Sequence, residues 1–178
     1  VTLDRFVGSI ALFEIKQPSL GFSPDGVSFV GGDFGEQRNR GVELFVSAEP
    51  MDGLRFTGGG SYVDAEITES DIAAIVGNDA LGVPDWTANA YVEWDLPFVP
   101  GLTLTGRVQY TGEQAANESN TLYLDDWTTF DLGARYVIAA GNVPVTLRAG
   151  VENVADEDYW ASAFTSFGGG NTARILQG

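Results

Sequence analysis

The side chains best suited to chemistry in this sequence are full charges set inside alternating polar and apolar runs. Asp131 and Arg135 alternate with apolar residues over 130–138, and Arg148 and Glu152 do so over 145–152. Successive side chains of a strand point to opposite faces, so each run predicts a strand with one ionic and one apolar face. The ionic faces must meet water or charged partners. The charges assigned to such faces are Arg55, Arg107, Arg135, Arg148, Glu43, Glu93, Asp131 and Glu152.

Several kinds of chemistry are excluded by composition. The sequence has no His and no Cys, so disulfides, imidazole or thiolate metal sites and Ser-His or Cys-His catalysis are ruled out. With 9 basic against 25 acidic residues the net charge is -16, which argues against nucleic acid as a partner. We predict no enzyme activity, no cofactor and no metal site. The acidic clusters of the connections do not match a calcium-loop spacing, and we interpret them as solvated faces.

The aromatic residues form two groups. One group lies at the ends of apolar faces, where a membrane interface favours aromatic rings, and comprises Tyr62, Trp86, Trp94, Tyr110, Trp127 and Tyr136. The other group lies in or beside long connections and is able to stack on a ligand. Its members are Tyr123, Tyr159, Trp160, Phe164 and Phe167, with girdle or loop packing as the alternative for Tyr159 and Trp160.

The elements that position these residues follow from the alternation. Short breaks and long polar connections alternate along the chain, which is the pattern of an up-and-down transmembrane β-barrel. The runs are about 10 residues, as a tilted membrane strand requires. In the first run we predict that Val7, Ala11, Phe13 and Ile15 face outward. About seven to eight strands are expected, at 4–16, 37–48, 54–64, 86–96, 102–111, 130–138, 145–152 and from 174 onward.

Three motifs give the sequence a family resemblance. They are RGVEL at 40–44, VPDW at 83–86 and NVADEDYW at 153–160, in that order. Together they resemble TonB-dependent outer-membrane receptors, most closely the ferric-siderophore type, and the last motif is the most specific. The resemblance implies that residues 1–178 are the C-terminal part of a single 22-stranded all-β, antiparallel barrel, without the plug domain and TonB box that such receptors carry.

The resemblance also implies a function. It predicts a receptor in the outer membrane of a Gram-negative bacterium that takes up a ferric siderophore, or a similar scarce ligand, into the periplasm. The implied partners are membrane lipid and lipopolysaccharide, the ligand, and the TonB complex through a missing N-terminal part. The charged faces would then line the lumen. There we expect arginines to pair with wall carboxylates or with the plug, rather than to form a path for anionic cargo.

Two other architectures give the same alternation. One is a small self-contained eight-stranded outer-membrane barrel, acting as a structural protein or a pore. The other is a soluble β-sandwich that serves as a binding module. The sandwich would bury the apolar faces between two sheets, whereas a barrel would turn them toward lipid.

Overall fold

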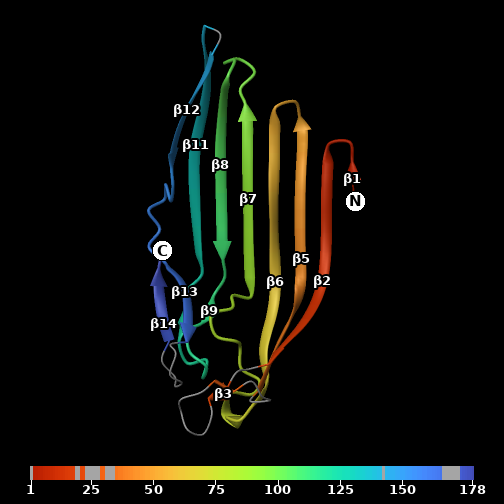
Figure 1. The fold of residues 1–178 in the computed structure, drawn as a ribbon, viewed down its shortest axis with the longest axis vertical. Coiled ribbons are helices and arrows are strands. Elements are labelled where there is room, and N and C mark those ends of the chain that lie inside the picture. Colours follow the sequence, from red (N-terminus) through yellow and green to blue (C-terminus); the bar gives the residue numbers. More distant parts are fainter. Residues whose placement is uncertain (1, 19–20, 23–28, 31–34, 142, 166–172) are drawn as a thin grey trace.

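Seven long antiparallel strands dominate the fold. The structure is a computed structural model, and it describes residues 2–18, 21–22, 29–30, 35–141, 143–165 and 173–178. The seven strands form one sheet with the short β1, in the order β1-β2-β5-β6-β7-β8-β11-β12 (Figure 1). The strands are β1 Thr2–Leu3, β2 Phe6–Pro18, β5 Gly35–Met51, β6 Leu54–Ser70, β7 Trp86–Asp95, β8 Leu102–Thr111, β11 Trp127–Ala140 and β12 Val143–Val151.

Smaller elements occupy the long connections. The three short hairpins are separate two-stranded sheets, and a single 3-10 turn, η1, follows β6. These elements are β3 Gly21–Phe22 with β4 Phe29–Val30, β9 Gln114–Ala115 with β10 Tyr123–Leu124, β13 Trp160–Thr165 with β14 Ala173–Gln177, and η1 Ala73–Ile75.

Short turns gather at one end of the sheet and long connections at the other, as Figure 1 shows. Three of the turns contain a glycine in the left-handed region, namely Gly53 (φ 77°), Gly101 (φ 84°) and Gly141 (φ 64°). A side chain is strained at such φ values, so glycine suits these tight reversals. The predicted alternation of short and long connections is therefore confirmed.

Cross-strand register defines the two faces of the sheet. Directly opposed residues of an antiparallel pair share a face. Val42 opposes Tyr62, and Tyr62 opposes Trp86, so the apolar residues of neighbouring strands fall on one common face. This outer face is uncovered, with Leu12 at 82% and Ile10 at 71% exposure. No second sheet covers it within the described residues, so the β-sandwich alternative is wrong.

The sheet is open in the part of the chain that the structure describes. There, β12 is hydrogen-bonded to β11 alone, and the opposite edge is formed by β1 and β2. A closed eight-stranded barrel would join those two edges, so the self-contained barrel is not what the structure shows.

The predicted faces of the first strand are wrong. Ile10 opposes Leu44 and Leu12 opposes Val42, which places Phe6, Ile10 and Leu12 on the outer face. The residues expected there, Val7, Ala11, Phe13 and Ile15, instead face inward. The prediction relied on grouping Glu14 and Lys16 with the inner polar side, whereas these two charges lie on the outer face beyond its apolar band.

Strands β5 and β6 are longer than the alternation suggested, at 17 residues each. Their extensions carry outer-face ion pairs, here called the outer lattice: Lys16–Glu36 (2.9 Å), Arg38–Glu66 (2.5 Å) and Arg40–Asp64 (2.7 Å). The sequence prediction ended this strand at Asp64 and left Glu66 in the following connection, but both are strand residues with basic partners. Alternation alone missed this because the outer face changes from apolar to ionic midway along each strand.

A glycine in β5 offers a test of strand packing. A methyl group at Gly41 would overlap the carbonyl oxygen of Tyr62 on β6, whereas one at Gly106 on β8 would meet Val92 Cγ1 at an ordinary 3.4 Å. We expect Gly41→Ala to destabilise the folded state by about 1–3 kcal/mol through overpacking. The measurement is the midpoint temperature of thermal unfolding. Gly106→Ala is the matched control, and equal effects of both changes would contradict the packing.

Candidate functional site

The inner face carries an ionic network near the short turns, here called the turn-end network. Arg55 donates from Nε to Glu93 (3.1 Å) and from Nη1 to Asp95 (2.8 Å). Asp95 also accepts from Thr103 Oγ1 (2.5 Å), which in turn accepts from Arg135 Nη2 (3.1 Å). These contacts cross β6, β7, β8 and β11, so the network ties four strands together.

A second inner-face contact lies closer to the long connections. Arg107 on β8 donates from Nε to Asp131 Oδ2 on β11 at 2.8 Å. The other oxygen of Asp131 accepts the backbone N–H of Asn153 at 2.9 Å. Asp131 therefore joins the wall to the connection that follows β12.

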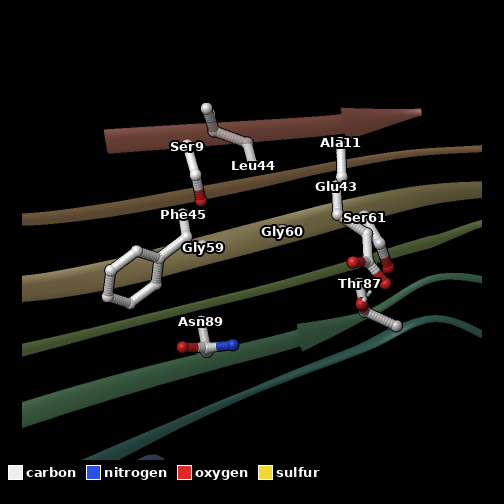
Figure 2. A pocket seen from close by; sticks show the side chains of 10 residues that line it. All are labelled: Ser9, Ala11, Glu43, Leu44, Phe45, Gly59, Gly60, Ser61, Thr87 and Asn89. Carbon is white, nitrogen blue, oxygen red and sulfur yellow. Dashed lines mark hydrogen bonds between the residues drawn. The ribbon is translucent and has the colours of Figure 1, made fainter. Parts of the chain in front are cut away.

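Three of the predicted inner-face charges have side chains without a hydrogen bond or ion pair within the described residues, namely Glu43, Arg148 and Glu152. Glu43 projects into a wall recess of about 310 Å³ (Figure 2). The recess is open because Ser9, Ala11, Gly59 and Ser61 are small. Ser61 and Thr87 are hydrogen-bonded at 2.8 Å along its rim. The recess thus presents one carboxylate to whatever occupies the inner side of the sheet.

Five of the six aromatic residues expected at membrane interfaces lie on the outer face, in two rows. Tyr62, Trp86 and Tyr110 lie toward the long connections, and Trp94 and Tyr136 lie toward the short turns. Tyr62 and Trp86 contact each other, with ring centroids 4.7 Å apart. The eight residue-to-residue steps from Trp86 to Trp94 span about 26 Å along the strand, which is close to the apolar height of a membrane barrel.

Trp127 departs from this pattern. It opposes Thr111, whose face is the inner one, so the prediction that it belongs to the outer girdle is wrong. Its ring stacks on Tyr159 with centroids 4.1 Å apart and an interplanar angle of 26°. The indole Nε1 is buried and has no hydrogen-bond partner in the described structure. The sequence could have predicted this position, because Trp127 is three residues from the outward-facing Phe130. Residues an odd number apart on a strand point to opposite faces.

The long connections pack together into what we call the loop-end cluster, residues 78–82, 114–124 and 159–165. Buried Ala116, Leu124 and Ala163 form its apolar contact. Gly82 N–H donates to the Ala115 carbonyl at 2.9 Å, and Asn120 accepts from the Asp79 N–H at 2.7 Å. Three segments far apart in the sequence are therefore held as one unit at this end of the sheet.

Tyr123 is held in this cluster by Asp79. Its hydroxyl donates to Asp79 Oδ2 at 3.3 Å. Burial raises the pKa of the Tyr123 phenol, and the carboxylate of Asp79 raises it further. The phenol consequently stays protonated as a donor at neutral pH.

The other aromatic ligand candidates lie at the same end of the molecule. Tyr159 contacts Trp127, while Trp160 and Phe164 on β13 are 51% and 40% exposed. Phe167 lies outside the described residues. The structure thus brings Tyr159 to Trp127, which the sequence had favoured as a girdle residue, and leaves Trp160 and Phe164 largely open to solvent.

Asn153 explains why the motif at 153–160 is a compact connection. Its backbone is in the left-handed region (φ 48°), which Asn tolerates better than most residues. Its side-chain Nδ2 donates to the Glu157 carbonyl (2.9 Å), and its Oδ1 accepts the Glu157 N–H (3.0 Å). Nothing in the residue spacing had indicated this role.

Neither a metal-binding group nor a membrane helix occurs among the described residues. No three His, Cys, Asp or Glu side chains there are arranged to hold a metal ion. No helix there is long and apolar enough to cross a membrane.

Comparison with known proteins agrees with this geometry. Residues 2–154 match a family described as TonB dependent receptor-like, beta-barrel. The chain belongs to this family of TonB-dependent receptor barrels. The family confirms the antiparallel barrel fold, the resemblance drawn from the three motifs and the location in the outer membrane of a Gram-negative bacterium.

Individual receptors extend the comparison. The chain is 44% identical over 89% of its length to the ferrichrome receptor FcuA of Yersinia enterocolitica, of which it covers 21%. It is 31% identical over 74% of its length to the metal-pseudopaline receptor CntO of Pseudomonas aeruginosa, covering 18%. The crystal structure of BauA, the ferric preacinetobactin receptor of Acinetobacter baumannii, superposes with a TM-score of 0.81 at 35% identity, over 90% of this chain and 25% of that one. The chain thus spans about a fifth of the length of these relatives.

The Asn153 contacts generate a prediction for this receptor barrel. Asn153→Ala removes both side-chain hydrogen bonds and disfavours the left-handed backbone, so we expect faster proteolysis of the connection at 152–159. Two lost bonds correspond to about 1–3 kcal/mol of local stability. Asn153→Asp keeps the oxygen that accepts the Glu157 N–H, so its cleavage rate should lie between those of the wild type and Asn153→Ala. Cleavage at the wild-type rate in Asn153→Ala would contradict this role.

Proposed function

We propose that this sheet is part of the barrel wall of a TonB-dependent transporter that takes up a ferric siderophore into the periplasm. The observation that carries the proposal is the division of the sheet into an apolar outer face and an ionic inner face. The relatives support the cargo class, because the names of FcuA and BauA specify ferrichrome and ferric preacinetobactin. In this proposal residues 1–178 belong to one barrel domain, and the plug lies outside this chain.

The aromatic pair of Trp127 and Tyr159 is the proposed ligand contact. It lies on the inner face at the end where the long connections meet, which is the extracellular end of an outer-membrane barrel. Aromatic rings offer a large, rigid surface on which the flat or apolar parts of a chelate can stack. Tyr123, Trp160 and Phe164 surround the same end as secondary candidates, and Phe167 stays a candidate from the sequence alone.

The remaining partners follow from the two faces. Membrane lipid would contact the outer apolar band between its two aromatic rows. Lipopolysaccharide would meet the outer lattice, where Lys16, Arg38 and Arg40 lie beyond that band. On the inner face Glu43 is available to a plug domain, and the TonB complex would act through that domain. The proposal includes no enzymatic step, in keeping with relatives that are named as receptors and transporters.

A second cargo is supported by one relative. The name of CntO specifies a metal-pseudopaline complex rather than an iron-only chelate. A chelate of another transition metal is therefore the alternative within the same transport function.

The ligand contact is tested in the complete receptor with iron-loaded ferrichrome as the probe. We expect Trp127→Ala and Tyr159→Ala each to weaken binding about tenfold, because a lost aromatic stack is worth roughly 0.5–1.5 kcal/mol beyond the lost area. Trp127→Phe and Tyr159→Phe keep a ring and should retain most of the affinity. Surface abundance of each variant is measured alongside. Wild-type affinity in both alanine variants would contradict the proposal that Trp127 and Tyr159 contact the ligand.

A further inference from the structure

One side chain joins two of the long connections by a double hydrogen bond. Asn120, in the connection after β8, accepts the Asp79 N–H at Oδ1 (2.7 Å) and donates from Nδ2 to the Asp79 carbonyl (3.1 Å). The two residues of a hydrogen-bonded pair in an antiparallel sheet exchange the same kinds of bond. The amide of Asn120 therefore takes the place of a strand neighbour for the backbone of Asp79, which lies in the connection after β6.

The turn at 117–122 presents this amide to the neighbouring connection. Asn117 Oδ1 accepts the backbone N–H groups of Thr121 (2.9 Å) and Leu122 (3.2 Å), and the Asn117 carbonyl accepts the Asn120 N–H at 3.1 Å. Asn120 is in the left-handed region (φ 50°), which Asn tolerates better than most residues. The turn is thus closed by bonds of its own, and the amide of Asn120 reaches outward to Asp79.

The segment that Asn120 holds lies against β13. Three residues beyond Asp79, the Gly82 N–H donates to the Ala115 carbonyl of β9 at 2.9 Å. A methyl group at Gly82 would overlap the Ala163 carbonyl of β13, so no side chain separates these two segments. The connection after β6 is therefore bonded to the connection after β8 on one side and packed directly on β13 on the other.

Strand β13 extends this contact to the aromatic pair. It begins at Trp160, directly after Tyr159, whose ring stacks on Trp127. Ala163 is buried at 5% exposure, so β13 is fixed at the point where it meets Gly82. Displacing β13 at Ala163 would move the backbone that carries Tyr159.

We infer that Asn120 is a positioning residue for the ligand site, because it holds the connection after β6 against β13 and so keeps Tyr159 stacked on Trp127. The bonds of Asn120 join groups of the protein only, so this part of the site is assembled before the chelate arrives. Asn120 acts through the aromatic pair and does not contact the chelate. The inference rests on the proposed function in taking that pair as the ligand contact.

The first test needs no chelate. Asn120→Gly removes both bonds to Asp79 and keeps the left-handed backbone accessible. In the complete receptor we expect the backbone amide hydrogens of residues 159–165 to exchange about fivefold faster than in the wild type, because this segment opens more often. The exchange is measured by mass spectrometry of the peptides that cover these residues.

Thr121→Val is the matched control for this experiment. It removes the bond from Asn117 Nδ2 to Thr121 Oγ1 (2.8 Å), which lies within the same turn and does not reach Asp79. Exchange in 159–165 should then stay at the wild-type rate. Unchanged exchange in Asn120→Gly, or an equal increase in Thr121→Val, would overturn the inference.

The second test determines whether Asn120 acts through Tyr159, with iron-loaded ferrichrome as the probe. We expect Asn120→Gly to weaken binding about fivefold in the wild-type background and less than about twofold in Tyr159→Ala, since a stack that is already lost cannot be loosened further. Asn120→Asp keeps the oxygen that accepts the Asp79 N–H and should recover part of the affinity. Equal weakening in both backgrounds would overturn the inference.

The same measurements separate this inference from the proposed function. If Tyr159→Ala weakens binding and Asn120→Gly does not, the ligand contact stands and only the positioning role is overturned. If Tyr159→Ala binds ferrichrome like the wild type, the proposed ligand contact is wrong. The positioning role is then overturned with it, even where the exchange rates respond to Asn120→Gly.

Discussion

The two-residue period of the β-strand is the constraint on which this structure depends. Each residue of a paired strand is committed to one face by its neighbours, so a register shift of one would exchange lipid-facing and lumen-facing side chains. Val42, Tyr62 and Trp86 show this commitment across three strands, and so do Arg55 and Glu93 on the opposite face. The same sheet can therefore be apolar outside and ionic inside without a packed core.

A wall built this way places its polar interactions where they tie strands together. The turn-end network spans four strands, and Asp131 connects β8, β11 and the connection after β12. The long connections contribute little apolar burial beyond Ala116, Leu124 and Ala163. Much of their order comes from hydrogen bonds between neighbouring connections and from side chains such as Asn153 that close a loop on itself.

Much of this fold could be predicted from the sequence, because alternation survives wherever one face is uniformly apolar. The bounds of β8 and the faces of β7 and β12 followed directly. The prediction failed for β2, where both faces carry large apolar residues and the charges of Glu14 and Lys16 lie on the outer face. Only its pairing with β5 distinguishes the two faces. The Trp127–Tyr159 contact and the Asn153 loop were beyond sequence reasoning, since both depend on how connections fold back against the wall.

The outer lattice limits how deeply the barrel can sink into its membrane. Moving the protein deeper by one two-residue repeat of a strand would bring Arg40 and Asp64 toward the hydrocarbon. Charged side chains become increasingly unfavourable there with depth. These charges lie on β2, β5 and β6, so these three strands set that limit in the described part of the wall.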